Sequence, residues 1–330
     1  GCVAGHRAVE LPAREMPWRD TGIDLEAGDA VSWFASGRVY LSKLLDIYVE
    51  PAFQLWARVG DGPVFRGTRA THTFRATRPG RLWLASYFPG EWTDRGGGLK
   101  AGPGDYAKLS GGMSVVLVQW QRGIDASRLL RDFAKRPDAP APVQAEAARL
   151  AEPTPAPEQW EYLWYLGEGE IYRPGRLQDG RPSIACRTQR DVGILRREAR
   201  LPLEPGTRLS WSWRVDALPS DLPEDTLPSH DYLSIAVEFD DGQDLTYYWS
   251  ASLPVGMVYR CPLPTWKDKE THVVQRSGAA ELGRWLDEDR DLYEDYRRCI
   301  GGPARHVVRV WLIANSLFQR GEGRCEYAGI

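Results

Sequence analysis

The chain has 330 residues, with 45 acidic and 42 basic side chains, a net charge of −3 and a pI near 6.1. Its hydrophobic content of 42% and its 14 tryptophans supply enough apolar material for packed cores, which excludes a wholly disordered chain. A run of about 18 apolar residues, as a membrane-spanning helix needs, does not occur. The near-neutral charge argues against a dedicated nucleic-acid binder, and the length predicts two domains.

The first residues, 1–16, are predicted to form an N-terminal tail that opens with Gly1 and Cys2. A small residue followed by cysteine resembles the end of a bacterial lipoprotein signal, in which the cysteine becomes the lipid-bearing first residue. The alternative is an arbitrary chain boundary. We expect an exported protein of the periplasm or outer membrane that is anchored through lipid on Cys2 and does not span the membrane.

Four other cysteines are available for disulfides in an exported protein, and they allow three pairings. We favour Cys186 with Cys325 and Cys261 with Cys299, the alternative being buried thiols. The sequence contains no CxxC motif and its five histidines are scattered. We therefore predict no structural zinc site and no metal ligands.

Residues 17–123 are predicted to form an antiparallel β-sandwich, because short apolar stretches alternate with Gly, Pro and Asp. The predicted strands are Ala30–Ser36, Phe53–Val59, Thr71–Ala76, Arg81–Tyr87 and Met113–Trp120.

Residues 124–157 differ in composition and mark the boundary between the domains. Apolar residues recur with helical period in 125–135, and Val143–Ala151 is rich in Ala and Leu. Prolines follow each of these segments, so two short helices in a stiff, proline-rich insert are predicted.

Residues 158–330 are predicted to form a second sandwich. Apolar and polar residues alternate strictly in 209–215, 233–239 and 245–249, which puts one face of each strand in a core. Trp211 and Trp213 are assigned to that core. A hairpin turn is predicted at 240–244 and a helix near 285–298. The fold class is therefore all-β, with two jelly-roll-like β-sandwich domains joined by a short helical, Pro-rich insert.

The first domain resembles the small calcium-dependent galactophilic bacterial lectins and the domains related to them. The similarity rests on residues 18–29 (WRDTGIDLEAGD), 35–37 (ASG), 55–60 (LWARVG) and 80–84 (GRLWL). The resemblance implies a jelly-roll sandwich with a calcium ion in a late loop, which here is 89–98. That loop offers the carboxylates Glu91 and Asp94, whereas calcium takes six to eight oxygen ligands. We therefore expect no cofactor; calcium is considered, but its lectin-type ligands are largely missing.

The second domain resembles a bacterial family known as domain of unknown function 3047. The similarity rests on residues 209–215 (LSWSWRV), 245–249 (LTYYW), 290–297 (RDLYEDYR) and 327–330 (YAGI). It implies an exported β-sandwich and assigns no activity. The family has an Asp-rich stretch where this chain has 314–323, which contains no Asp.

Two sets of residues are candidates for ligand binding, since sugar sites combine aromatic rings with planar charged groups. In the first domain the candidates are Trp92, Asp94, Arg95, Asp105 and Tyr106 of the late loop, and the resemblance to the lectins adds Tyr40, at the place of a tyrosine near the ion in that family. In the second domain, on strand faces opposite the core, they are Arg214, Glu238, Tyr248 and Trp311. The alternatives are an ordinary polar loop for the first set and a packing surface for the second.

Catalytic residues are not assigned, because no nucleophile, phosphate-loop or metalloprotease motif occurs. The most favoured function is a non-catalytic binding or accessory protein that recognises a glycan or serves in an envelope complex with other proteins. One alternative is a polysaccharide-acting enzyme using carboxylates of 231–244 and 287–295. Another is a purely structural subunit.

Overall fold

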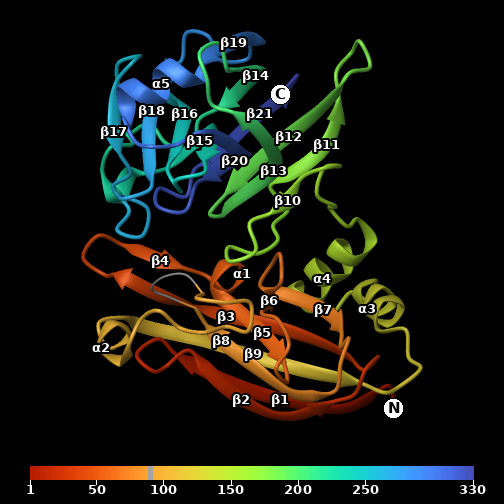
Figure 1. The fold of residues 1–330 in the computed structure, drawn as a ribbon. Coiled ribbons are helices and arrows are strands. Elements are labelled where there is room, and N and C mark those ends of the chain that lie inside the picture. Colours follow the sequence, from red (N-terminus) through yellow and green to blue (C-terminus); the bar gives the residue numbers. More distant parts are fainter. Residues whose placement is uncertain (88–91) are drawn as a thin grey trace. The chain divides into compact units, whose positions relative to one another are not determined.

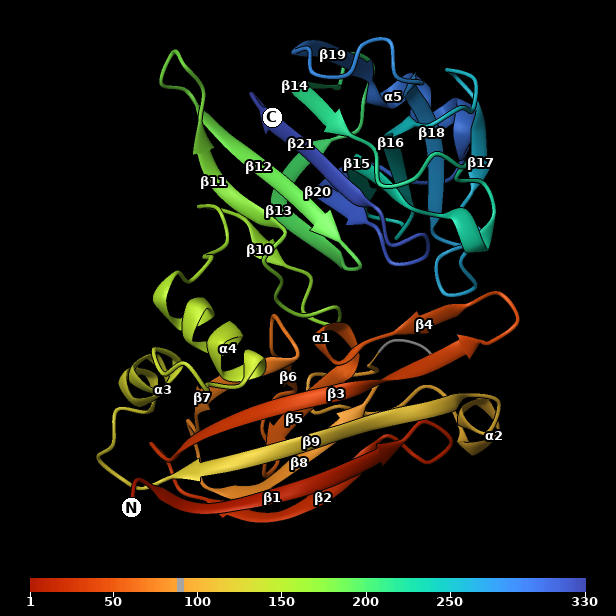
Figure 2. The same cartoon turned by 180° about the vertical axis from the view of Figure 1, so that it is seen from behind.

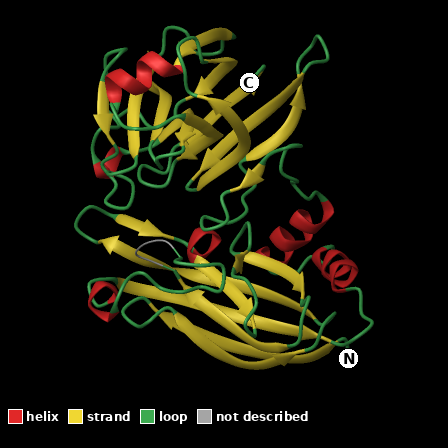
Figure 3. Ribbon diagram, in the orientation of Figure 1, coloured by secondary structure: helices red, strands yellow, loops and turns green. Residues whose placement is uncertain are grey.

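A computed structural model of the chain describes residues 1–87 and 92–330, so Glu91 lies outside the described residues. The chain divides into two compact units, Gly1–Pro153 and Thr154–Ile330. Strands dominate each unit (Figures 1 and 3), which confirms the predicted all-β class. Among the described residues, no helix has both the length and the apolarity needed to cross a membrane.

The first unit contains two sheets (Figure 2). One has the strand order β1-β9-β3-β4, with β7 also paired to β3, and the other has the order β2-β8-β5-β6. The strands are β1 (Val3–Pro12), β2 (Trp18–Leu25), β3 (Ala30–Ser42), β4 (Ile47–Val49), β5 (Leu55–Val59), β6 (Phe65–Arg66), β7 (Thr71–Arg75), β8 (Gly80–Ser86) and β9 (Ser110–Trp120). On β9, Met113, Val115 and Leu117 are buried whereas Val116 is exposed, as period-2 alternation requires.

The helices of the first unit are short. They are α1 (Pro51–Gln54), α2 (Pro103–Tyr106), α3 (Ala126–Ala134) and α4 (Ala141–Ala151). Glu146 connects helix α4 to β7: its side chain is fully buried and accepts a hydrogen bond from Thr71 Oγ1 at 2.9 Å. Arg149 on the next turn of α4 completes an ion pair with the same carboxylate. The two helices of the proline-rich insert therefore belong to the first unit.

The second unit is a sandwich of a seven-stranded and a five-stranded sheet. Their strand orders are β10-β13-β20-β15-β16-β18-β17 and β11-β12-β21-β14-β19. The strands are β10 (Glu161–Tyr162), β11 (Tyr172–Arg176), β12 (Pro182–Gln189), β13 (Val192–Pro202), β14 (Arg208–Ala217), β15 (Tyr232–Phe239), β16 (Asp244–Ser250), β17 (Val258–Arg260), β18 (Glu270–Ser277), β19 (Leu286–Asp291), β20 (His306–Asn315) and β21 (Glu322–Ala328). A 3₁₀ turn η1 (Leu227–Ser229) and helix α5 (Leu292–Cys299) complete the unit.

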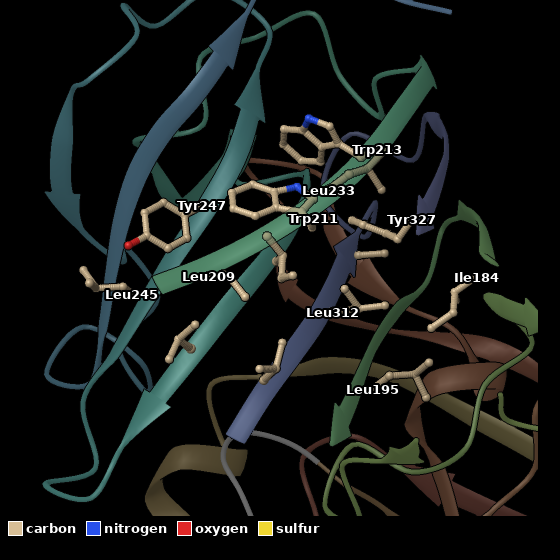
Figure 4. Packing of buried hydrophobic residues seen from close by; sticks show 14 of the residues in the cluster. Ile184, Leu195, Leu209, Trp211, Trp213, Leu233, Leu245, Tyr247, Leu312 and Tyr327 are labelled. Carbon is tan, nitrogen blue, oxygen red and sulfur yellow. The ribbon is translucent and has the colours of Figure 1, made fainter. Parts of the chain in front are cut away.

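The main core of the second unit lies between its two sheets (Figure 4). Trp211 and Trp213 of β14 are 2% and 0% exposed and pack with Tyr247 and Trp249 of β16, which confirms their predicted place in the core. The predicted turn at 240–244 is also present, because it joins β15 to β16 with Gly242 at φ 77°.

The helix predicted near 285–298 is wrong in its first half, where β19 pairs with β14 instead. Residues 287–291 alternate: Glu288 points inward and accepts a hydrogen bond from Trp213 Nε1 at 2.9 Å, whereas Asp287 and Asp289 bond to β14 hydroxyls. Helix α5 begins only after Asp291, whose carboxylate caps it by accepting the Glu294 amide.

The cysteines of the described chain are free thiols, which contradicts both predicted disulfides. Cys186 on β12 and Cys325 on β21 do lie directly opposite each other in register. Burial, reinforced by the neighbouring Cys325, raises the pKa of the Cys186 thiol well above its usual value, so it stays protonated. Cys261 and Cys299 pack in different clusters: Cys261 in a group of buried residues outside the main core, Cys299 against the main core.

Candidate functional site

The tryptophan predicted to bind a ligand in the first unit is inside the protein. Trp92 is 3% exposed and stacks on Tyr87, with ring centroids 4.2 Å apart, and on Trp18 at 5.3 Å. Trp56 meets it edge-on at 5.6 Å. A ring enclosed by three others offers no surface for stacking on a sugar, so the prediction for Trp92 is wrong.

The other residues predicted in this region serve their own loops. Asp94 accepts hydrogen bonds from the amides of Gly96 and Gly98, and these bonds with that of Thr93 lower its pKa. The backbone carbonyl of Arg95 accepts the Val64 amide, and Asp105 accepts the Gly102 amide at the start of α2. Tyr106 is 2% exposed, and burial raises its pKa to about 12. The side chains of Asp94 and Asp105 therefore bind the backbone of their own turns, and the Tyr106 ring is not accessible.

Tyr40 lies in a different place, on the part of β3 that pairs with β4. Its ring meets Tyr48 at 5.5 Å and lines a shallow hollow of about 710 Å³ together with Arg38 and Glu50. Arg38 lies over the Tyr48 ring at 4.4 Å and pairs with Glu50 at 3.3 Å. Arg38 and Glu50 supply the charged groups of this hollow, and Tyr40 supplies a partly accessible ring.

The four residues predicted on the second unit do not share a face. Glu238, Tyr248 and Trp311 belong to the seven-stranded sheet, whereas Arg214 belongs to the five-stranded sheet. Tyr248 and Trp311 are 0% and 6% exposed because loop residues cover the face of the sheet that lies opposite the main core. Glu238 is held in an ion pair with Arg309 at 2.9 Å. The prediction that Glu238, Tyr248 and Trp311 form an open recognition face with Arg214 is therefore wrong.

Around Arg214, the structure gathers an aromatic ring and planar charged groups on the solvent-facing side of the five-stranded sheet. The guanidinium carbon of Arg214 lies 5.6 Å from the ring centre of Trp285, a side chain that is 37% exposed. Arg214 also pairs with Asp216 at 3.1 Å and with Glu326 at 3.4 Å. Arg214 and Glu326 are directly opposite each other on β14 and β21, so they point to the same side.

A groove of about 580 Å³ adjoins this group through Ser183. Ser183 lines the groove and donates a hydrogen bond to Glu326 Oε1 at 2.5 Å. Polar side chains such as Gln159 and Arg176 line it with apolar ones, including Trp160. Arg197 lies over the Trp160 ring at 4.9 Å and donates a hydrogen bond to the Ile330 carbonyl.

The carboxylates proposed for an enzyme are engaged in structural contacts. Asp231 accepts the amides of Phe318 and Gln319, and burial raises its pKa to about 6. Asp295 is bound by Arg290, Arg298 and the Tyr247 hydroxyl. The other pairs are Glu238 with Arg309, Asp240 with His306, Asp241 with Tyr296, Asp244 with Thr246, Asp287 with Ser212, Glu288 with Arg276, Asp289 with Arg208, Asp291 with Arg208 and Glu294 with Arg297.

Four side chains of the metal-ligating types meet on the loop-covered face of the seven-stranded sheet: His230, Cys261, Glu270 and His272. Burial and then the adjacent His272 ring lower the pKa of His230 to about 3, so its imidazole is neutral at pH 7. Burial alone would raise the pKa of Glu270, but the His272 and His230 rings and Cys261 outweigh it and hold that pKa at about 2.

Sequence reasoning missed Trp285 and this buried cluster for different reasons. Trp285 was assigned to the apolar face of a helix, whereas it precedes the edge strand β19. Gly283, which adopts a positive φ in the turn before β19, could have indicated that a strand begins after it. The four clustered residues come from separate segments and carry no spacing motif, so the sequence offered no signal for their meeting.

No curated protein matches the chain, whereas 44 chains of solved structures do. Among solved structures, the chain is similar to the EclA N-terminal domain, a PllA-like lectin, at 18% identity and TM-score 0.26, over 34% of this chain and 95% of that one. It is also similar to the xyloglucanase domain of NopAA, a type three effector from Sinorhizobium fredii, at 10% identity and TM-score 0.31, over 52% and 91% of the two chains. An exo-beta-agarase matches at 14% identity and TM-score 0.22, over 54% and 23%. Scores this low carry no information on ligands.

The family match is stronger and agrees with the resemblance of the second domain. The model of the family described as "Protein of unknown function (DUF3047)" matches residues 158–330, which is more than half of the chain and all but the first four residues of the second unit. The strands, the main core and the Arg214 group of that unit all lie within the match. The chain therefore belongs to the DUF3047 family.

Proposed function

We propose that the chain is a non-catalytic binding protein that recognises a glycan through the solvent-facing side of the five-stranded sheet, around Arg214, Trp285 and Glu326. The observation that carries this proposal is the half-open Trp285 ring beside a guanidinium and two carboxylates. An aromatic ring can stack on the C–H face of a sugar, while Arg and carboxylate groups bind paired hydroxyls. The adjoining groove extends this surface past Ser183 and offers room for further sugar units.

A binding role is favoured over catalysis by the state of the acidic side chains. Glycoside hydrolysis needs two carboxylates that flank the scissile bond, one of them available as an acid. The carboxylates of 231–244 and 287–295 instead bind arginines, hydroxyls or backbone amides. Asp216 and Glu326 likewise form ion pairs with Arg214.

The experiment is a glycan array probed with the full-length chain, followed by calorimetric titration of any oligosaccharide that binds. Trp285→Ala should weaken binding about tenfold or more, since the stacked ring is lost. Phe133→Ala is the matched control, because Phe133 is 38% exposed and also lies under an arginine, Arg136, at 5.0 Å. Absence of binding to any glycan, or equal effects of the two substitutions, would contradict the proposal and favour a purely structural subunit.

We further propose that the protein is exported and held at the membrane by lipid on Cys2, where it would serve in an envelope complex. Cys2 is exposed and precedes β1, so the side chain is accessible for acylation. Metabolic labelling with an alkyne fatty acid should mark the wild-type chain and not Cys2→Ala. Cys299→Ser serves as the control, and retention of label in Cys2→Ala would contradict the anchor.

A further inference from the structure

The buried cluster of His230, Cys261, Glu270 and His272 lies on one face of one sheet. Glu270 and His272 are two residues apart on β18, so their side chains point to the same side. Cys261 directly follows β17, the edge strand beside β18, and its amide bonds to the Glu270 carbonyl. His230 comes from the segment after η1. Three separate segments therefore deliver side chains to one point.

The distances within the cluster suit a tetrahedral metal site. One ligand atom from each residue lies within 4.8 Å of all the others. His230 Nε2 is 3.4 Å from Cys261 Sγ, and His272 Nε2 is 3.3 Å from Glu270 Oε1. Bonds of about 2.0–2.3 Å to a tetrahedral ion would place neighbouring ligand atoms about 3.3–3.8 Å apart. Only small side-chain shifts separate the cluster from that arrangement.

The poorly satisfied ring of His272 is a second sign that something binds here. Its side chain is 0% exposed; Nδ1 makes no hydrogen bond to any described residue, and Nε2 only approaches Glu270 Oε1, at 3.3 Å and without hydrogen-bond geometry. A buried polar group without a partner costs about 1–3 kcal/mol, which is why such groups are rare in native proteins. A metal ion on one nitrogen would remove much of this cost.

The surroundings of the cluster resemble the outer shell of a metal site. His230 Nδ1 donates to the Glu224 carbonyl at 2.6 Å, which leaves the Nε2 lone pair directed at the cluster. Glu270 Oε1 accepts hydrogen bonds from Tyr232 at 3.1 Å and Thr246 at 3.0 Å, so the carboxylate is held in place. A divalent ion would also balance the two negative charges of a Cys261 thiolate and Glu270, which matters in a buried site.

We propose that His230, Cys261, Glu270 and His272 bind one divalent transition-metal ion of the zinc class in a closed, structural site. Two imidazoles, one thiolate and one carboxylate suit zinc, whereas calcium and magnesium take oxygen ligands. The ion fastens the segment after η1 and the segment after β17 to β18. It lies on the seven-stranded sheet, so it is separate from the Arg214 surface and does not depend on glycan binding.

The test measures zinc binding by the full-length, folded chain after metal has been stripped with a chelator. Competition with a chromogenic chelator should report one tightly held zinc per chain. Cys261→Ser and His272→Gln should each weaken binding by more than the about 10–100-fold expected for an outer-shell change such as Tyr232→Phe. Cys299→Ser and His306→Gln are the matched controls and should bind like the wild type.

Cobalt substitution of the wild-type chain provides a second readout that needs no variant. The expected spectrum has the intense visible bands of tetrahedral cobalt and a thiolate-to-cobalt charge-transfer band, which disappears in Cys261→Ser. A folded wild-type chain that binds no zinc, or that gives a weak octahedral cobalt spectrum, overturns the proposal. Unchanged zinc affinity in both Cys261→Ser and His272→Gln overturns it as well.

Discussion

Acid should destabilise the first unit through the imidazole of His72 on β7. This ring packs against Trp33 at 4.8 Å and stacks on Phe74 at 6.3 Å. Burial, reinforced by the positive charge of Arg149 and opposed by Glu146, lowers its pKa from 6.5 to about 4. The folded unit therefore holds the neutral ring, whereas the unfolded chain takes up a proton below pH 6.5.

The size and sign of the effect follow from this difference in pKa. Because the unfolded state binds more protons, stability contributed by neutral His72 is present above pH 6.5 and is lost as the pH falls towards 4. The full loss amounts to about 3 kcal/mol. That is a large fraction of the stability of a domain, which is commonly about 5–15 kcal/mol.

The assay is urea unfolding of the full chain, followed by tryptophan fluorescence at several pH values between about 7 and 4. The phenylalanine of the His72→Phe variant cannot be protonated. The free energy of unfolding of this variant should therefore fall by about 3 kcal/mol less than that of the wild type over this pH range. Phe74→Leu is the control: it removes packing beside the ring and should lower stability by a similar amount at every pH. Parallel stability profiles for His72→Phe and the wild type would refute the reasoning.

Three further substitutions test the packing. Glu146→Ala leaves the half-buried Arg149 without its carboxylate and should cost about 3–5 kcal/mol in urea unfolding, whereas an exposed ion pair costs under about 1 kcal/mol. Trp211→Ala should cost about 3–5 kcal/mol and lower the melting temperature of the second unit; a loss below about 1 kcal/mol would contradict the core assignment. Gly37→Ala should destabilise the first unit, because φ is 109° and a Cβ would lie 2.3 Å from the Gly112 carbonyl oxygen; unchanged thermal unfolding would argue against that backbone conformation.

The strands with a strict period of two were predictable from the sequence alone. Each of the five strands expected in 17–123 from short apolar stretches between Gly, Pro and Asp is present, although Phe53 and Gln54 belong to α1 and not to β5. Strands β1, β2, β4 and β6 were missed. Most of β1 is exposed, so its residues lack the apolar stretch that marked the others. Segment 285–291 was misassigned because its apolar residues fit a helical spacing while its charged residues alternate as in a strand.

The candidate sites were predictable only in part. Arg214 was expected on a solvent-facing strand surface and is there, next to Trp285. Trp92, Tyr248 and Trp311 were expected to be accessible and are buried. Alternation states which side chains share a face, but it does not state whether loops cover that face.

Composition and alternation by themselves determined that this is an all-β protein with substantial cores, and they placed Trp211 and Trp213 inside. Those properties depend on local spacing along a strand. The tertiary structure alone decided where the other tryptophans went and that His230, Cys261, Glu270 and His272 meet. Their meeting depends on which strands pair and which loops fold over the sheet, and pairing between distant segments leaves no local pattern in the sequence. The unusual number of tryptophans therefore reflects packing, with Trp285 as the exposed exception used in the proposed glycan surface.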